Sequence, residues 1–566
     1  MLGGRVPGAP AAGTQFRSAS LWAKRQLTNP NGLLLRLWPA RAGERIELVA
    51  SLLFVSVGIF LRSRHFFVDP IPLFGDETNW ALRLGEDLSR ATLRPVGFMA
   101  LSKLMAHWFG FTEVALRFFP WLFGVGSSVL ALPLGQRLFR APAARLLLVA
   151  VVAFHPFCID YCKEFKPYSI SLFIHFFCLF AAASYLKLGS ARWLAVTLAA
   201  SAFGILFAQD VLFAYPGLYL ALALTAFQRR ARRHGIVVAL SGLATLALVF
   251  SLYWFFWRHL DVGSDATQQY WGGRYHVFFA PGAESRWHWL VGKTADVIAF
   301  PGVRRWFWAT RGPFQSAELE TLGKMDLLVW VALYAIGVLA LAFQRRAAEA
   351  LLLLTPLLTT LIFNQLGLWP FGVFRTNLFL LAYTLPVAAL ALDAPGAPVA
   401  SWRAFVPVTL LVLAPLVAFE KNWHAQKIAS SPSVFFEALN ALVELQGHDL
   451  PEQRELLVID GSACRVWLFY KQHHADHEQL FSELERRFAD RCAPSRGETA
   501  FKRAHRGVRG HPRRFWLLLQ RAGEQAAFRG DQAPAGYRVF AKKELGSGLN
   551  LVVGLDPIDK RPRRSR

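Results

Sequence analysis

Cysteine and methionine are rare in this chain, and acidic residues are few. Its 566 residues include 5 Cys, 4 Met and 38 Asp+Glu, against 62 Lys+Arg. Cys158 and Cys162 form a lone C-x3-C pair, and two thiols do not make a zinc site without further ligands. We therefore interpret these two as ordinary packing residues. Cys464 and Cys492 lie in the C-terminal region, where an oxidising compartment would allow a disulfide, and the sequence leaves their pairing open.

The N-terminal segment, residues 1–45, contains no apolar core. A cleavable signal peptide is therefore not expected there. The segment carries seven basic residues, which favour a cytoplasmic N-terminus. The first apolar stretch, at about 46–62, then serves as an uncleaved anchor.

Apolar residues make up 54% of the chain, aromatic residues 14%, and the mean hydropathy is +0.32. Several stretches reach the roughly 20 apolar residues that a membrane span needs. We predict an α-helical polytopic membrane protein with about 11 transmembrane helices. The expected spans are 46–62, 114–136, 143–157, 168–187, 193–208, 210–227, 236–257, 326–343, 350–364, 376–392 and 404–419. Residues 95–110 are apolar but short, and we interpret them as a helix lying at the membrane interface.

The net charge of +24 raises the possibility of nucleic-acid binding. The positive-inside rule explains this charge better, because the basic residues gather in alternate short connections such as "GQRLFRAPAAR" and "QRRARRHG". The short outer loops at 209–210 and 365–375 are poorer in basic residues, with none in the first and only Arg375 in the second. We therefore expect no nucleic-acid partner, and we place the N-terminus in the cytoplasm.

This orientation leaves three large pieces outside the membrane. Two are loops, 63–113 and 258–325, within a membrane domain spanning 46–419. The third is a periplasmic α/β domain at 420–555, followed by a basic tail at 556–566. Within it, "ELLVID" and "RFWLLLQ" read as strands, "PSVFFEALNALVEL" as a helix, and "YRVFAKKELGSGLNLVVGL" as two strands around a glycine turn.

The first outer loop contains "PLFGDETNWALRLGED", with Asp76 and Glu77 adjacent. Acids are common at helix starts, where the helix dipole favours negative charge, so a purely structural role is one interpretation. The other interpretation is a functional site. Placing two adjacent carboxylates close to a bilayer costs free energy, so such a pair is rarely found without a role in binding or catalysis.

A second ionisable cluster lies in "HPFCIDYCKEFKPYS", which joins two spans on the same side. A short link needs only turn residues, whereas this one is rich in charged and phenolic groups. Lysines reaching the membrane surface beside exposed acids are the structural alternative. The candidate residues here are Asp160, Tyr161, Lys163, Glu164, Lys166 and Tyr168.

A third signal is Arg375, the only charge in the outer loop before the span at 376–392. An arginine there runs against the positive-inside bias. Its planar fork suits a phosphate group, although an interfacial arginine reaching lipid headgroups would look the same. Together the three signals predict a pocket on the outer face that takes a substrate with a phosphate and a long apolar tail.

These motifs resemble those of the GT-C superfamily of glycosyltransferases, within it the dolichyl-phosphate-mannose protein mannosyltransferase and aminoarabinose-transferase-like group. "FGDETNWALRL" is similar to the Asp-Glu motif of that group's first outer loop. "TEVALRFFPWLFGVGSSVLALPLGQRLF" resembles its second span, and "WPFGVFRTNLFL" a late outer-loop motif around an arginine. Glu164, Lys166 and Tyr168 fall on the Glu, Arg and Tyr of a further motif. The chain departs from the pattern in having Lys166 in place of Arg, and in lacking a His-Pro-Pro after the first loop.

The resemblance implies a GT-C-like fold and an enzyme that transfers a sugar from a polyprenyl-phosphate donor. The acceptor would be a hydroxyl or amine on a glycan, lipid or protein. It implies Asp76 as catalytic base or substrate ligand. We assign Asp76 the role of base and Glu77 that of orienting the site. The outer-loop groups Asp160, Glu164, Lys166, Tyr168 and Arg375 would bind the substrate.

No cofactor is required by these residues, although Asp76, Glu77 and Asp160 could supply oxygen ligands to a divalent cation. His473, His474 and His477 are interpreted as solvated helix surface, and His155 and His175 as structural residues. A lipid transporter or flippase is the alternative function, but we find no inverted repeat and no midplane charges of the kind that transporters use. A family member that only binds its ligand is a further alternative.

Overall fold

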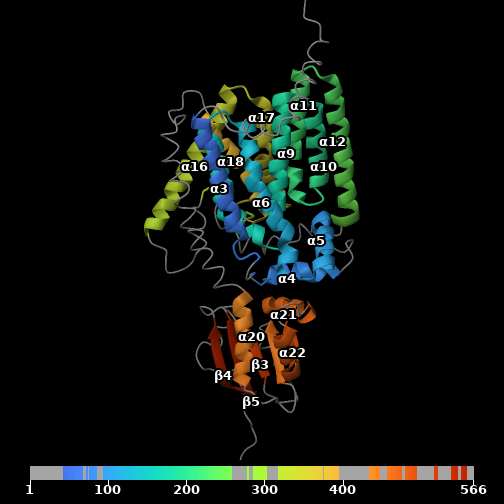
Figure 1. The fold of residues 1–566 in the computed structure, drawn as a ribbon, viewed down its shortest axis with the longest axis vertical. Coiled ribbons are helices and arrows are strands. Elements are labelled where there is room, and N and C mark those ends of the chain that lie inside the picture. Colours follow the sequence, from blue (N-terminus) through green and yellow to red (C-terminus); the bar gives the residue numbers. More distant parts are fainter. Residues whose placement is uncertain are drawn as a thin grey trace, which may run out of the picture. The chain divides into compact units, whose positions relative to one another are not determined.

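A computed structural model places a large part of the chain (Figure 1). It describes residues 42–67, 70, 72–73, 75–85, 94–257, 277–279, 285–302, 317–373, 375–393, 432–446, 455–473, 478–493, 515–519, 537–545 and 550–557. The expected span at 404–419 and the basic tail beyond residue 557 lie outside these ranges. The chain divides into two compact units, residues 1–53 and 54–566. The first is described only where helix α3 (Ala42–Ser63) begins.

The larger unit contains a bundle of helices that are mostly apolar. In chain order they are α4 (Gly75–Ala81), η1 (Leu82–Gly85), α5 (Val96–Phe109), α6 (Glu113–Leu138), α7 (Pro142–Phe154), α8 (Pro156–Asp160), η3 (Tyr161–Lys163), α9 (Tyr168–Leu188), α10 (Ala191–Gly204), η4 (Gln209–Phe213), α11 (Tyr215–Gln228), α12 (Arg232–Leu252), η5 (Tyr253–Trp257), α14 (Arg286–Ile298), α16 (Ala317–Phe343), α17 (Ala347–Gln365), η6 (Arg375–Leu380), α18 (Leu381–Leu390) and η7 (Ala391–Asp393).

Seven helices in the placed ranges are long and apolar enough to cross a membrane, or eight if the bent pair formed by α7 and residues 156–163 counts as one span. The chain is thus a multi-pass membrane protein, as the hydropathy predicts. The expected number of eleven is too high for these ranges. The predicted spans at 193–208 and 210–227 form helices α10 and α11, but each has only 14 residues. Fourteen residues extend about 21 Å, which is short of a bilayer core of about 30 Å.

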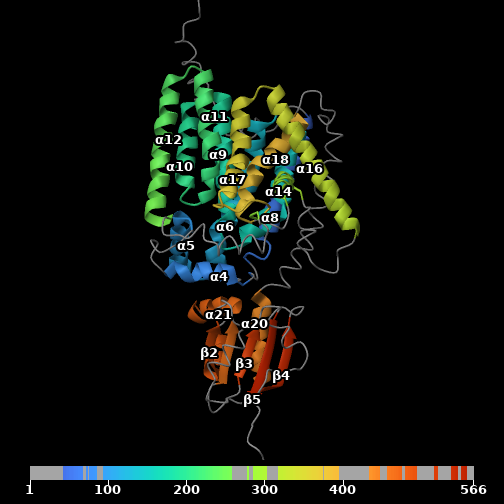
Figure 2. The same cartoon turned by 180° about the vertical axis from the view of Figure 1, so that it is seen from behind.

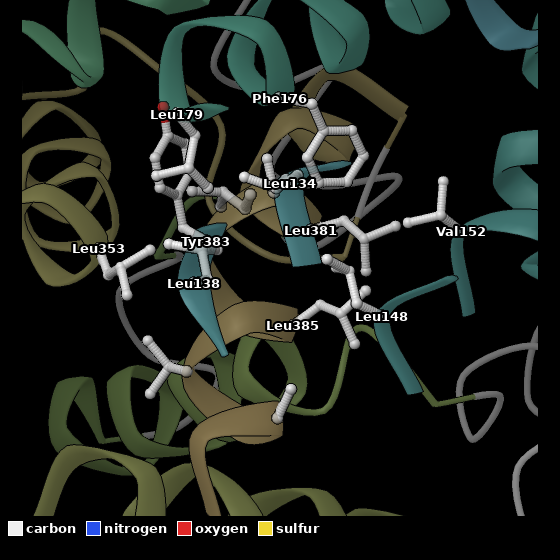
Figure 3. Packing of buried hydrophobic residues seen from close by; sticks show 14 of the residues in the cluster. Leu134, Leu138, Leu148, Val152, Phe176, Leu179, Leu353, Leu381, Tyr383 and Leu385 are labelled. Carbon is white, nitrogen blue, oxygen red and sulfur yellow. The ribbon is translucent and has the colours of Figure 1, made fainter. Parts of the chain in front are cut away.

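The core of the bundle is packed by apolar side chains from five helices. Figure 3 shows Leu134 and Leu138 of α6 beside residues of α7, α9, α17 and α18. Gly337 of α16 has no Cβ, and one added there would overlap the carbonyl oxygen of Val387 in α18. Small residues of this kind let two backbones approach closely, which is how membrane helices gain packing contacts. The bundle therefore holds the ends of α6, α9 and α18 in fixed positions relative to each other.

The C-terminal region forms a five-stranded mixed sheet in the order β2-β1-β3-β5-β4. Its strands are β1 (Glu455–Asp460), β2 (Phe488–Ala493), β3 (Phe515–Leu519), β4 (Tyr537–Leu545) and β5 (Asn550–Pro557). β1 pairs in parallel with β2 and β3, while β5 pairs antiparallel with β3 and β4. Helix α20 (Pro432–Gln446) lies on one face of the sheet (Figures 1 and 2). The helix and strands predicted for this region are confirmed.

Helices α21 (Gly461–His473) and α22 (Glu478–Arg487) connect β1 to its parallel neighbour β2. Parallel strands require such a crossover, and helices usually supply it. Cys464, in α21, is disulfide-bonded. Cys158, Cys162 and Cys178 are free, buried thiols. The side chain of Cys492 lies outside the described residues, so the question of its pairing with Cys464 stays open.

Candidate active site

The two acids of the first loop begin helix α4 and point in different directions. Consecutive residues of a helix are separated by about 100° around its axis. The Asp76 side chain is one-third exposed, whereas that of Glu77 is completely buried. One acid is therefore directed into the protein, and the other toward the groups described below.

Glu77 binds Arg117, in the second turn of α6, through a two-pronged ion pair. Arg117 Nε donates to Glu77 Oε1 over 2.8 Å, and Nη2 donates to Oε2 over 2.5 Å. The backbone N–H of Phe165 also donates to Oε1. Paired charges with this geometry are among the strongest hydrogen bonds in proteins. Glu77 therefore fastens α4 to α6 and to the link before α9. Because Asp76 is the preceding residue of α4, these contacts also fix its position.

Asp76 is the meeting point of two cations from distant parts of the chain. Lys166 Nζ lies 3.1 Å from Asp76 Oδ2, and Arg375 Nη2 lies 2.9 Å from the same oxygen. Lys166 Nζ also donates to the backbone oxygen of Asp76 over 3.1 Å. The acid comes from α4, the lysine from the link before α9, and the arginine from the start of η6. We call these three residues the acid–cation triad.

The triad changes how its members bind protons. Burial and repulsion from Arg375 lower the pKa of Lys166 to about 8, even though Asp76 pulls that pKa upward. Burial alone would raise the pKa of Asp76, but attraction from Lys166 and Arg375 outweighs it and holds the pKa below its ordinary value. Asp76 is thus ionised at neutral pH. Lys166 is still mostly protonated there and loses its charge as the pH rises through about 8.

Further predicted residues lie around the triad. The guanidinium carbon of Arg375 stands 6.0 Å from the ring centre of Tyr168. Glu164 is buried, and its charge raises the pKa of Lys166. Asp160 is buried at the end of α8. The structure therefore brings Asp76, Lys166, Arg375, Tyr168 and Glu164 into one neighbourhood.

Trp80 belongs to this neighbourhood, although the sequence analysis did not select it. Lys166 Nζ lies over its indole ring at 4.3 Å from the centroid, and Arg94 lies at 5.0 Å. Such stacking stabilises a cation that is shielded from water. Residues four apart on a helix share a face, so the spacing of Trp80 from Asp76 was the available signal.

A buried chain of hydrogen bonds extends the site to Tyr470 of α21. Its hydroxyl donates to Glu113 Oε1 over 2.6 Å and accepts from the backbone N–H of Leu73 over 2.8 Å. Glu113 stands one helical turn before Arg117 on α6. Arg117 in turn donates to the backbone oxygen of Pro72 over 3.2 Å. The segment before α4 is therefore held from both sides, which fixes where Asp76 stands.

The described residues include no group of three or more His, Cys, Asp or Glu arranged to hold a metal ion. A divalent cation bound by Asp76, Glu77 and Asp160 was considered from the sequence. Glu77 is unsuited to that role, because both its oxygens are occupied by Arg117 and by the Phe165 N–H.

Comparisons with known proteins bear on the membrane domain. The family model described as "Dolichyl-phosphate-mannose-protein mannosyltransferase" matches residues 94–254. Residues 94–254 of this chain are thus similar to members of that family. The family segment runs from Arg94 to Trp254 and so includes Arg117, Lys166 and Tyr168. The resemblance noted in the sequence is confirmed over this range. No match was found among curated protein sequences.

Solved structures with similarity to this chain are remote. The oligosaccharyltransferase of Archaeoglobus fulgidus, solved with zinc and sulfate, is 14% identical with a TM-score of 0.41. The match covers 79% of this chain and 62% of that one. ArnT from Cupriavidus metallidurans matches in the apo state at 14% identity and a TM-score of 0.39. Its complex with undecaprenyl phosphate matches at 13% and 0.34. Both ArnT matches cover 89% of this chain and 97% of that chain.

Proposed function

We propose that this protein is a membrane glycosyltransferase of the bacterial inner membrane. It moves a sugar from a polyprenyl-phosphate-linked donor to an acceptor hydroxyl or amine at the periplasmic face. The observation that carries this proposal is the acid–cation triad, in which Lys166 and Arg375 both contact Asp76. The family match over residues 94–254 supports the same reaction class.

The triad supplies the groups that this reaction needs. Lys166 and Arg375 hold the donor phosphate, because both are cations and the arginine offers a fork that matches phosphate oxygens. A phosphate that draws these cations toward itself weakens their hold on Asp76. The pKa of that carboxylate then rises from its lowered value, and Asp76 becomes a stronger base when the donor is bound.

The chemical step is a single displacement at the anomeric carbon of the donor sugar. The acceptor oxygen or nitrogen forms a bond to that carbon, and the bond from the carbon to the phosphate oxygen breaks. Asp76 takes the acceptor proton. The polyprenyl phosphate leaves with the bonding electron pair and stays paired with Lys166 and Arg375. A phosphate is a good leaving group once its charge is neutralised, so one base and two cations suffice.

Other residues position these groups. Glu77 and Arg117 fasten the helix that carries Asp76. Tyr168 lies against Arg375 and limits where the guanidinium can turn. Asp160 and Glu164 are proposed to complete the substrate-binding surface. The acceptor itself, whether glycan, lipid or protein, is to be identified by mass spectrometry of envelope glycans in cells lacking this chain.

The proposal is tested with Asp76→Asn, which keeps the side-chain shape and removes the base. Purified protein in vesicles is given a labelled polyprenyl-phosphate sugar and envelope acceptors, and the glycosylated product is measured. We expect the variant to lose about 10²–10⁴-fold in rate, the usual contribution of a positioned base. Glu437→Gln, an exposed acid of α20, is the matched control and should transfer at the wild-type rate.

Two results would contradict the proposal. The first is an unchanged rate of sugar transfer in Asp76→Asn. The second is a wild-type protein that carries the labelled lipid across the vesicle membrane without forming any glycosylated product, which is the behaviour of a flippase.

A further inference from the structure

A polar cavity lies at the opposite end of the helices that carry the acid–cation triad. Helix α6 begins close to the triad and ends in the cavity wall, and its 26 residues extend about 39 Å. Helix α9 starts two residues after Lys166 and has Lys187 in its last turn. The segment from Arg375 to Asp393 runs between the same two regions. The cavity is therefore separate from the proposed active site.

The cavity has a volume of about 500 Å³, within the range of ligand-binding pockets. Its wall comes from the ends of α6, α9, α16 and η7, and from the start of α17. Four cations and two acids line it: Arg137, Arg140, Lys187, Arg346, Glu349 and Asp393.

Both acids of the cavity are already engaged. Asp393 Oδ1 accepts from the backbone N–H groups of Arg140, over 2.7 Å, and of Ala141, over 2.6 Å. Its other oxygen lies 3.9 Å from Arg346 Nη1. Glu349 accepts a hydrogen bond from the same guanidinium. Arg346 therefore uses both acids, which leaves three cations of the wall to be balanced.

Arg137, Arg140 and Lys187 form no ion pair with any residue that the structure places. The cations also repel each other: burial and, to a smaller extent, repulsion from Arg140 lower the pKa of Arg346, although Asp393 raises it. The positive-inside rule explains why basic residues occur at this end of the bundle. It does not explain why they line one open cavity with an excess of positive charge.

Exposed apolar surface adjoins the cavity. Phe343 precedes the wall residue Gln344 and is 83% exposed, and Leu188 follows Lys187 and is 50% exposed. Apolar side chains this exposed at the end of a membrane helix contact acyl chains. A phospholipid lying against them would bring its headgroup to the height of the cavity.

We propose that this cavity binds the phosphate of an anionic phospholipid headgroup. Arg137, Arg140 and Lys187 donate to the phosphate oxygens, and the acyl chains lie along Phe343 and Leu188. By the orientation expected from the sequence, this headgroup belongs to the cytoplasmic leaflet. The site is independent of the proposed sugar transfer, and its test does not depend on activity.

The test uses the full chain, delipidated in a zwitterionic detergent. Binding of short-chain phosphatidylglycerol, phosphatidylcholine of equal chain length, and inorganic phosphate is followed by native mass spectrometry and by the shift in unfolding temperature. We expect one phosphatidylglycerol to bind with high occupancy. The double variant Arg140→Gln/Lys187→Gln should weaken that binding about tenfold or more, because it removes two charged donors. The backbone bonds of Arg140 to Asp393 are unaffected by this change.

The matched control is Arg232→Gln/Arg233→Gln, which removes the same charge from two exposed residues at the start of α12. It should bind like the wild type. Equal loss in the control, equal binding of phosphatidylcholine, or saturation by inorganic phosphate at the concentration that suffices for the lipid would each overturn the proposal. If the double variant does not fold, Arg137→Gln alone is measured against the same control.

Discussion

At the scale of the residue, the proton affinity of Lys166 has a direct consequence. Its pKa is lowered to about 8, mainly by burial, so the ammonium loses its charge above that pH. Arg375 alone would then face a donor phosphate. Asp76 stays ionised throughout this range, because its own pKa lies below its ordinary value.

We therefore expect donor affinity to fall by up to about tenfold as the pH rises from about 7 to about 9, as the protonated fraction of Lys166 does. Equilibrium binding of a polyprenyl-phosphate sugar measures this. Lys166→Arg keeps its charge in this range and should bind the donor equally at both values. A wild-type affinity that is flat with pH would contradict a phosphate-binding role for Lys166.

Also at this scale, the buried pair Glu77–Arg117 should be sensitive to the loss of one partner. Arg117→Ala leaves a carboxylate buried without its cation, which typically costs about 3–5 kcal/mol. We expect a large drop in unfolding temperature in detergent. The double variant Glu77→Gln/Arg117→Met removes both charges and should recover most of that loss. A single variant as stable as the wild type would show that the pair does not fasten α4.

At the scale of the element, a second buried network joins α9, η4 and α18. Ser171 donates to Asp210 Oδ2 over 2.6 Å, and His175 Nε2 lies 3.3 Å from Asp210 Oδ1. His175 Nδ1 lies 2.7 Å from the Tyr383 hydroxyl. All four residues are buried, and these hydrogen bonds join them to one another. This arrangement fits the structural role expected for His175.

Removing the central acceptor of this network should destabilise the bundle. Asp210→Ala leaves the Ser171 hydroxyl and His175 without their partner, at a cost of about 1–3 kcal/mol for each buried polar group left unsatisfied. Asp210→Asn retains an acceptor oxygen and should lose less. Thermal unfolding of the two variants in the same detergent gives the comparison. If both variants unfold at the wild-type temperature, Asp210 is not needed to hold η4 against α9.

At the scale of the whole molecule, Tyr470 links the C-terminal sheet region to the loop that carries Asp76. Its hydroxyl is the acceptor for the Leu73 N–H and the donor to Glu113. Burial and the nearby Glu113 charge raise the pKa of Tyr470 well above its ordinary value, so the hydroxyl keeps its proton.

We expect Tyr470→Phe to speed hydrogen exchange at the Leu73 amide, because the variant has no acceptor there. Exchange in strand β1 should be unchanged, which serves as the internal control. Phe469→Leu, the adjacent buried residue, tests for general disturbance of α21 and should leave Leu73 protected. Unchanged protection of Leu73 in Tyr470→Phe would mean that this hydrogen bond does not hold the loop.

The sequence predicted those elements whose formation depends on the pattern of neighbouring residues. Apolar runs identified the spans that became α3, α6, α9, α12, α16, α17 and α18, because a bilayer requires such runs. Strand β2 was missed, since "FADRCA" mixes charged with apolar residues at one edge of the sheet, where no hydrophobic alternation is required. Helices α10 and α11 were found as apolar runs, but their lengths were overestimated.

Composition and spacing by themselves determined that the chain is a helical membrane protein. They marked Asp76, the charged link that contains Lys166, and Arg375 as candidates. Only the tertiary structure decided that these three meet, that Glu77 points to Arg117, and that cations from several helix ends line one cavity. The physical reason is that hydrophobic periodicity reports which side of one element is buried. It carries no information on which distant element is packed against that side, and the chemistry of both sites depends on such distant contacts.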